Sequence, residues 1–216
     1  PLVMSSANLP GQPMPRTLDE LWDASALADV VLGHDRAIVT RCDDSVVRTG
    51  GPQPSILRRS RGYVPTPITL PTCASGAVLA LGADADVTVA TVRGDRCELS
   101  AHLGSLDSVA AVGAYRTAIE RHRALTGVAD PTLVVHDQHP AFASTEHARE
   151  LADATDAALL PVQHHHAHAA SVLAEHNLPA AVIITADGTG LGTDGTIWGG
   201  EVLACDGPEY TRVDGL

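Results

Sequence analysis

The stretch AVLALGADADVTVATVRGDRCELS, residues 77–100, alternates apolar runs with short polar turns. Such alternation predicts three successive β-strands. Strand-like and helix-like segments then take turns along the rest of the chain. The expected strands cover residues 132–136, 157–163 and 180–186, and the expected helices cover 107–125, 144–154 and the histidine-rich stretch from 164 to about 175. Strands that give way to alternating strands and helices indicate an α/β fold with a mixed sheet.

The segment 107–125 carries a helical signal. Apolar side chains recur at helical intervals between Val109 and Leu125, which is the pattern of a helix with one buried face. Asp107 stands just before the first of them and is the expected N-cap, because a carboxylate there accepts hydrogen bonds from unpaired backbone N–H groups.

The charge balance narrows the classes of function. The chain of 216 residues has a formal net charge of −12, and all 14 of its basic residues are arginine. General binders of nucleic acid or anionic membranes need a broad basic surface, so both classes are disfavoured. Because the chain has no lysine, it contains neither a P-loop lysine nor a Schiff-base lysine. Any anionic substrate must be held by a local cluster of charge.

The spacing of the cysteines bears on metal and redox motifs and on location, and the first residues bear on whether the chain is a piece of a longer protein. The cysteines form no C-x-x-C pair, so the chain has no zinc ribbon or dithiol motif, and a reducing cytoplasm is the expected location. No apolar run approaches the roughly 18 residues of a membrane span. The chain begins with the apolar run PLVM and without an initiator Met, and we expect it to be a piece of a longer protein.

The organisation of the sequence changes near residue 70. VPTPITLP, residues 64–71, contains three prolines that predict a stiff connector and a domain boundary. Upstream, ILRRSRG at 56–62 gathers three arginines that suit a phosphate or carboxylate, although an exposed basic turn explains them equally well. The polar side chains of SSAN at 5–8 and DDSVVR at 43–48 are candidates to line one pocket.

The segment VQHHHAHAAS, residues 162–171, places four histidines at the start of an alanine-rich helix, directly after an apolar strand. Open α/β sheets usually bind ligands at the carboxyl ends of their strands. On a helix, His164 and His168 are four residues apart and point from one face, so their imidazoles can share one metal ion. His165 and His166 point elsewhere and are expected to be supporting donors, substrate contacts or surface residues. The alternative is a helix start that is merely solvated.

A carboxylate would complete such a site. ITADGTGLGTDG, residues 184–195, places Asp187 at the end of the next strand, immediately before a glycine-rich turn. Neighbouring parallel strands would bring Asp187 close to the histidine helix, and a His–His–Asp set suits a divalent Fe, Zn or Mn ion. The glycines also permit close approach to phosphate, as in sugar-kinase and actin-like folds, although a tight hairpin containing Asp-Gly explains them nearly as well.

Five longer motifs follow one another along the chain: PLVMSSANLPGQP at 1–13, DRAIVTRCDDSVVR at 35–48, ILRRSRGYVPTPI at 56–68, VQHHHAHAAS at 162–171 and ADGTGLGTDGTIWGGE at 186–201. In this order they closely resemble the HypF family of hydrogenase maturation carbamoyltransferases. The resemblance spans nearly the whole chain. The O-carbamoyltransferases of antibiotic biosynthesis share the same two-domain core and are the closest alternative.

The resemblance implies a two-step use of carbamoyl phosphate. In HypF-like proteins an acylphosphatase-like domain releases carbamate, and a YrdC-like domain joins it to ATP, giving carbamoyl adenylate and pyrophosphate. A metal-dependent domain of the actin-like superfamily then passes the carbamoyl group to the C-terminal cysteine of the partner HypE, where it becomes the cyanide ligand of the NiFe centre. The implied cofactors are a divalent metal, Fe or Zn, and ATP with Mg.

The resemblance also implies a division of the chain and a role for each motif residue. Residues 1–68 would end a YrdC-like α/β domain, 69–76 would be a linker, and 77–178 would form the first lobe of an actin- or sugar-kinase-like, ribonuclease-H-type mixed-sheet domain whose second lobe starts at 179–216. The implied contacts to nucleotide and carbamoyl adenylate are Ser5, Ser6, Asn8, Ser45, Arg58, Gly188, Thr189 and Gly190. The implied catalytic residues and metal ligands are His164, His168 and Asp187.

The chain departs from the family pattern at both ends. The acylphosphatase-like domain, the C-x-x-C zinc fingers and the start of the YrdC-like domain are absent from it, and a final metal ligand would lie beyond Leu216. We therefore expect this chain by itself not to complete the reaction. The acceptor, a protein thiol or a small-molecule hydroxyl, stays open, as does a non-catalytic metal- or nucleotide-binding module.

Overall fold

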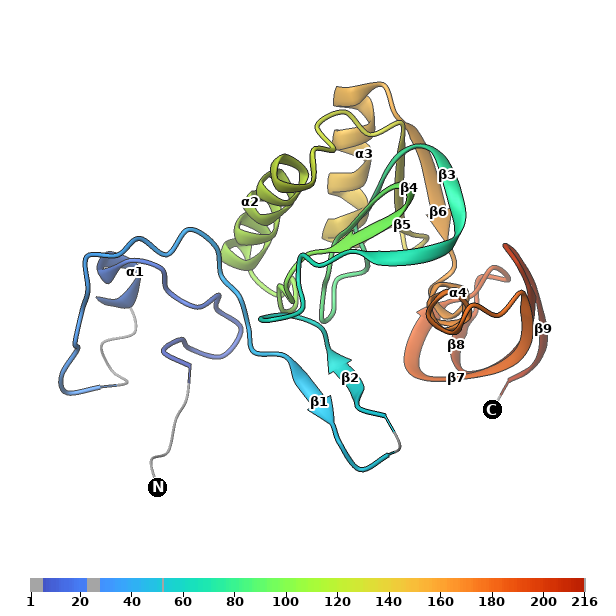
Figure 1. Ribbon diagram of the computed structural model, residues 1–216, viewed down its shortest axis with the longest axis horizontal. Helices are drawn as coiled ribbons and strands as arrows, with labels where there is room; N and C mark the ends of the chain where they lie inside the picture. Colours follow the sequence, from blue (N-terminus) through green and yellow to red (C-terminus); the bar gives the residue numbers. More distant parts are fainter. Residues whose placement is uncertain (1–5, 23–27, 52, 216) are drawn as a thin grey trace.

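The computed structural model describes residues 6–22, 28–51 and 53–215. An irregular N-terminal part precedes two β-sheets (Figure 1). The N-terminal part contains the short helix α1 (Leu18–Trp22) and the antiparallel strands β1 (Val46–Arg48) and β2 (Ser55–Arg58). The mixed α/β class expected from the sequence is confirmed.

The first sheet has four strands and is mixed in direction. Its members are β3 (Ile68–Ala80), β4 (Ala90–Leu99), β5 (Leu133–Asp137) and β6 (Ala158–Val162), in the order β4-β3-β5-β6. β3 runs antiparallel to β4 and parallel to β5, and β5 is parallel to β6. The carboxyl ends of β3, β5 and β6 therefore meet at one edge of the sheet. Residues 69–76, expected to be a linker, lie within β3, and the domain boundaries stay a prediction.

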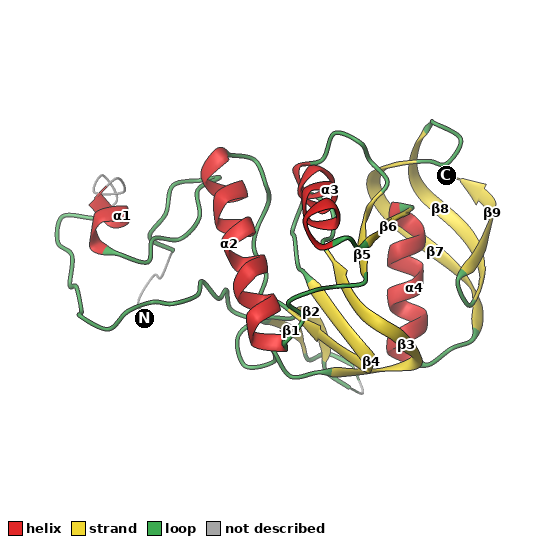
Figure 2. Cartoon of the chain, turned by 90° about the horizontal axis from the view of Figure 1, so that it is seen from above, coloured by secondary structure: helices red, strands yellow, loops and turns green. Residues whose placement is uncertain are grey.

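Helices α2 (Val109–Thr126) and α3 (Ala143–Thr155) pack against this sheet (Figure 2). Leu79 and Val134 of the two central strands share one apolar core with Tyr115 and Ile119 of α2. The Tyr115 hydroxyl donates a hydrogen bond to the Leu81 carbonyl oxygen at 3.0 Å, so its polar atom is satisfied inside the core.

The cap of α2 differs by one residue from the expected Asp107. Ser108 is the N-cap, and its hydroxyl accepts the backbone N–H of Ala111 at 3.2 Å. An N-cap side chain must reach an N–H two or three residues further along the chain, which Ser108 does for the helix that begins at Val109.

Residues 77–100 form two strands rather than the expected three. The loop between β3 and β4 contains Gly82 and Asp86, whose φ angles of 71° and 46° are left-handed and interrupt a strand. Val87 is nevertheless buried, and its backbone N–H donates to the Gly104 carbonyl oxygen at 2.9 Å. Burial without strand pairing explains why this loop resembles a strand in the sequence.

The second sheet is antiparallel and consists of β7 (Ala180–Leu191), β8 (Ile197–Asp206) and β9 (Glu209–Gly215). Helix α4 (His164–His176) lies between the two sheets (Figures 1 and 2). Its core contacts with the second sheet involve buried apolar residues: Ala169, Leu173, Trp198, Leu203 and Cys205. This core positions the helix that carries the histidines.

Asp187 therefore approaches α4 by a route that differs from the expected one. Its strand, β7, pairs with β8 and belongs to a different sheet from β6, so it is not the parallel neighbour of the strand before α4. The packing of α4 on the second sheet brings Asp187 to the histidines instead. Asp187 also lies inside β7 rather than at its end, because the strand continues to Leu191 across an irregularity between Ala186 and Gly190.

Candidate metal centre

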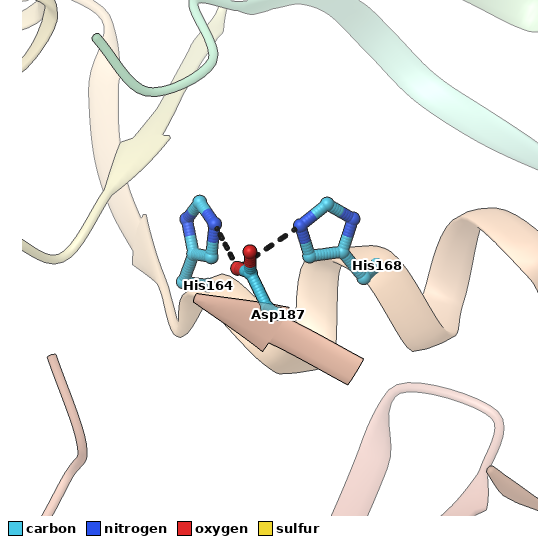
Figure 3. A group of neighbouring side chains, drawn as sticks. All are labelled: His164, His168 and Asp187. Carbon is cyan, nitrogen blue, oxygen red and sulfur yellow. Dashed lines mark ion pairs between the residues drawn. The ribbon is translucent and has the colours of Figure 1, made fainter. Parts of the chain in front are cut away.

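Three side chains from two elements meet at the start of α4 (Figure 3). His164 and His168 extend from successive turns of this helix, and Asp187 extends from β7. Asp187 Oδ2 lies 2.9 Å from His164 Nε2 and 3.5 Å from His168 Nε2. One nitrogen or oxygen atom from each residue lies within 4.8 Å of the others, and within the described ranges this is the one His, Cys, Asp and Glu group so arranged.

Gln163 fixes the start of α4. Its side-chain oxygen accepts the backbone N–H of His166 at 2.8 Å, so the helix begins at His164. Its side-chain amide donates to the Leu191 carbonyl oxygen at 3.2 Å. Since Leu191 ends β7, one side chain joins the start of the helix to the strand that carries Asp187.

Gly190 allows β7 to come close to the helix. A Cβ atom at this position would lie 2.7 Å from His165 Cε1 and 3.1 Å from His164 Cβ. His165 is fully buried at this contact, and its Nε2 lies 2.8 Å from the Gly199 carbonyl oxygen, to which it donates. His166 stacks on Tyr210 with ring centroids 4.3 Å apart. These two histidines thus pack α4 against the second sheet.

The three residues differ in how their surroundings act on their pKa values. The hydrogen bond to Asp137 raises the pKa of His164 against the opposing effect of burial. Burial lowers the pKa of His168. Burial alone would raise the pKa of Asp187, but the Gly188 N–H and the nearby histidines outweigh it and hold this pKa below its ordinary value. Asp187 is therefore ionised at neutral pH.

The donor set fits a divalent transition metal ion. Imidazole nitrogen and carboxylate oxygen are ligands that Zn²⁺ and Fe²⁺ accept. Asp187 Oδ2 is buried, and no described group meets it in hydrogen-bonding geometry although His164 Nε2 is near. Bonds of about 2.0–2.2 Å in a tetrahedral site would set ligand atoms about 3.3–3.6 Å apart. The separations of 2.9 and 3.5 Å are close to that spacing.

A cavity of about 340 Å³ opens beside the two histidines. Its walls are the loop after β3, the carboxyl ends of β5 and β6, and the exposed side of α4. The His168 side chain is 57 % exposed. A ligand can therefore reach these atoms from the edge of the first sheet, where α/β folds commonly bind their substrates.

Asp137 is a further residue of this site, which was not predicted from the sequence. This residue ends β5, is buried, and places its Oδ2 2.7 Å from His164 Nδ1. The signal that could have found it is a carboxylate directly after the apolar run TLVVH, at the same edge of the sheet as the histidine helix.

Some of the residues expected to contact nucleotide line another cavity, of about 510 Å³, in the N-terminal part. They are Ser6, Asn8 and Arg58. Arg61 lines the same cavity, whereas Ser45 does not; its hydroxyl donates to the Arg61 carbonyl oxygen at 2.8 Å and accepts the Ser60 N–H at 2.9 Å. Ser5 lies outside the described residues.

The prediction of a glycine-rich turn at residues 188–190 is wrong. Gly188, Thr189 and Gly190 lie within β7, and strand pairing resumes where Gly190 faces Trp198. The β7–β8 turn comes later, at residues 192–195, where Gly195 has a φ of 77°. The expected tight hairpin containing Asp-Gly is therefore the turn at residues 192–195. A nucleotide contact by residues 188–190 stays a prediction.

Known proteins match this chain along most of its length. The family described as HypF Kae1-like domain matches residues 74–175, and the family described as carbamoyltransferase, Kae1-like domain, second subdomain, matches residues 183–216. The Sua5, YciO and YrdC family, described as telomere recombination, matches residues 1–60. The carbamoyltransferase HypF2 of Cupriavidus necator is 45 % identical over 221 residues, covering 100 % of this chain. The chain belongs to the HypF family.

Other HypF proteins are similar over the same extent. The probable carbamoyltransferase HypF of Methanocaldococcus jannaschii is 40 % identical over 99 % of this chain and 28 % of its own length. A crystal structure of full-length HypF in the phosphate- and nucleotide-bound form matches with a TM-score of 0.89 and 39 % identity over 97 % of this chain. The chain spans 27 % of the Cupriavidus HypF and 27 % of that crystallised chain. These matches confirm a HypF-like fold that includes a YrdC-like N-terminal part.

Proposed function

We propose that this chain carries the carbamoyl-transfer site of a HypF-type enzyme. In this proposal carbamoyl phosphate and ATP give carbamoyl adenylate, and the carbamoyl group passes to the C-terminal cysteine of a HypE-like acceptor. One observation carries the proposal. The potential ligands His164, His168 and Asp187 converge within the regions that match the HypF Kae1-like families.

Nε2 of His164, Nε2 of His168 and a carboxylate oxygen of Asp187 would hold the ion, for which we propose Zn²⁺ or Fe²⁺. A divalent ion bound there supplies positive charge that polarises a carbonyl group and offsets the charge that develops during acyl transfer. The two histidines lie on one rigid helix and the carboxylate on a strand, so the protein holds the three donors in place before substrate arrives.

The transfer exchanges one bond of the carbamoyl carbon for another. The acceptor sulfur, as thiolate, bonds to this carbon, and the bond from the carbon to the adenylate phosphate oxygen breaks. AMP leaves with the electron pair, and the thiol proton passes to solvent. The cavity beside His164 and His168, at about 340 Å³, is at the small end of ligand pockets.

The cavity in the N-terminal part is the proposed place of adenylate formation. Arg58 and Arg61 line it together with Ser6 and Asn8. Guanidinium groups bind phosphate oxygens through paired hydrogen bonds, and ATP would enter with Mg²⁺. We assign the phosphates of ATP and carbamoyl phosphate to this arginine pair.

We place the reaction in the cytoplasm. The four cysteines are free and lie in the described part of the chain. Free thiols persist in a reducing compartment. Among the described residues, no helix has the length and apolar character needed to cross a membrane.

Metal content tests the site directly. The anaerobically purified chain should contain close to one metal ion per molecule by mass spectrometry, and His164→Ala and His168→Ala should each lose it. His176→Ala is the matched control, because His176 lies on the same helix but in its last turn. Metal that persists in all variants, or that is lost equally in the control, would contradict the proposed ligands.

An activity test requires a protein that carries this chain within the full HypF architecture. His164→Ala should abolish carbamoyl transfer to the acceptor and leave carbamoyl-phosphate-dependent ATP–pyrophosphate exchange intact. Equal loss of both activities would contradict a role limited to transfer. Absence of exchange in the unmodified protein would favour the non-catalytic module, and transfer to a small hydroxyl compound in place of the thiol would favour an O-carbamoyltransferase.

A further inference from the structure

Both carboxylate oxygens of Asp137 are engaged. Oδ1 accepts the backbone N–H of His139 at 2.8 Å, and Oδ2 lies 2.7 Å from Nδ1 of His164. The carbonyl oxygen of the same residue accepts the Thr145 hydroxyl at 3.0 Å. Only 7 % of Asp137 is exposed. Turning this side chain away would leave the part-buried His139 N–H and the His164 ring without their partner, so it is held in one orientation.

This contact decides where the hydrogen atom of the His164 ring lies. An ionised carboxylate can only accept, and of the two carboxylates beside the ring only Asp137 meets it in hydrogen-bonding geometry, so Nδ1 carries the hydrogen of the neutral ring and donates it. In the neutral ring, Nε2 then has a free lone pair. The same Nε2 lies 2.9 Å from Asp187 Oδ2, on the side of the ring where His168 also stands (Figure 3). The tautomer set by Asp137 is thus the one that can bind a metal ion.

Asp137 stands apart from the three potential ligands. Nδ1 and Nε2 project from different sides of an imidazole ring, and Asp137 contacts the first while Asp187 contacts the second. Each oxygen of Asp137 already accepts a hydrogen bond, and Asp137 is not among the three residues whose potential ligand atoms converge. Its contribution to the site therefore passes through the His164 ring.

The two histidines of the site differ in this respect. The His168 side chain is 57 % exposed and its Nε2 is 3.5 Å from Asp187, and no other described side chain pairs with its ring through a hydrogen bond. We propose that Asp137 is a positioning residue that fixes the tautomer and orientation of His164 for metal binding. This proposal rests on the metal site of the proposed function. Carboxylates in such a position typically change metal affinity by about 10–100-fold.

Asp137→Asn separates this role from simple packing, because asparagine has the same shape but one acceptor oxygen. If that oxygen accepts the His139 N–H, the amide NH₂ faces His164 Nδ1 and can only donate to it. The ring hydrogen must then move to Nε2, which blocks the atom that binds the ion. In the opposite orientation, two donors face each other at His139.

Asp84→Asn is the matched control. The Asp84 carboxylate also accepts through both of its oxygens, but from two backbone N–H groups, those of Ala143 at 2.9 Å and Ser144 at 3.0 Å, and not from His164. Both variants should lose stability in urea denaturation. Only Asp137→Asn should change the His164 ring and the affinity for zinc.

The experiment combines ring ¹⁵N NMR with zinc titration. The metal-free, ¹⁵N-labelled chain is examined about two pH units above the ordinary histidine pKa, and His164 signals are assigned by their loss in His164→Ala. The unmodified chain should show hydrogen on Nδ1, and Asp137→Asn should show it on Nε2. Zinc should bind Asp137→Asn about 10–100-fold more weakly than the unmodified chain or Asp84→Asn.

Hydrogen on Nε2 in the unmodified chain would overturn the proposal without any variant, even if Asp137→Asn fails to fold. A changed tautomer with zinc affinity within about threefold of the unmodified chain would also overturn it. If the unmodified chain shows hydrogen on Nδ1 but binds no zinc, the metal site of the proposed function fails, while the control of the His164 tautomer by Asp137 is still decided by the NMR comparison.

Discussion

Replacing Gly190 by alanine should push the start of α4 away from β7. The added Cβ would lie 2.7 Å from His165 Cε1, 3.0 Å from His165 Nδ1 and 3.1 Å from His164 Cβ. Ordinary contact begins at 3.4 Å, so the nearest approach is about 0.7 Å too short. His165 cannot yield alone, because its ring is fully buried and donates to the Gly199 carbonyl oxygen. The first turn of the helix must move instead.

The expected size of the effect follows from this overlap. Overpacking a well-filled contact costs about 1–3 kcal/mol, and we expect Gly190→Ala to lower the free energy of unfolding by that amount. The displacement also exceeds the tolerance of about 0.5 Å within which ligand groups must be held. His164 and Asp187 would separate, and zinc affinity should fall at least about tenfold, which corresponds to about 1.4 kcal/mol.

Gly188→Ala is the matched control on the same strand, because a Cβ at Gly188 would meet nothing within 4 Å. Its free energy of unfolding should stay within about 0.5 kcal/mol of the unmodified value. Urea denaturation of the metal-free chain measures stability, and calorimetric titration with zinc measures affinity. The reasoning is refuted if the two variants behave alike, or if Gly190→Ala binds zinc as tightly as the unmodified chain.

Two further predictions concern the first sheet and α2. Burial lowers the pKa of His122, whose Nε2 lies 3.0 Å from the Glu98 carbonyl oxygen, so the unfolded chain takes up this proton at a higher pH than the folded chain. As the pH drops below about 6.5, the free energy of unfolding should therefore decrease, by up to about 1.4 kcal/mol per pH unit. His122→Gln keeps a hydrogen-bond donor but does not titrate, so it should weaken this decrease. Urea denaturation between about pH 7.5 and about pH 5.5 measures the difference. An unchanged pH dependence would contradict this account. Gly113 lies inside α2, where a Cβ would meet nothing within 4 Å. Gly113→Ala should therefore raise the free energy of unfolding by about 0.5–1 kcal/mol. An unchanged or lower melting temperature in thermal denaturation would contradict this prediction.

Local features of the fold could be predicted from the sequence, whereas the grouping of strands into sheets could not. The apolar periodicity of 107–125 and the alanine-rich run after the histidines both lie in helices. β7 was expected in the same sheet as β6, but the apolar face of α4 packs on the strands that follow it and places β7 in a second sheet. Sequence order does not show which face of a helix a later strand covers.

In the candidate metal site, likewise, some residues could be predicted from the sequence and one could not. The spacing of His164 and His168 follows from helix geometry, and the structure places Asp187 beside both. Asp137 could not be found by spacing, because its contact with His164 joins residues 27 apart and depends on β5 and β6 being neighbours. A hydrogen bond between the end of one strand and the helix that follows its neighbour leaves no periodic signal in the sequence.

The small residues around the histidines matter as much to this site as the ligand types. Ala169 is fully buried in the core between α4 and the second sheet, and Gly190 faces the same helix from the strand. A larger side chain at either position would increase the distance between helix and strand and separate His164 from Asp187. The spacing of two histidines places them on one face of a helix, but close packing over alanine and glycine brings the carboxylate of another sheet within reach. Ala169 of VQHHHAHAAS and Gly190, three residues after Asp187, are therefore part of what makes this motif able to bind a metal ion.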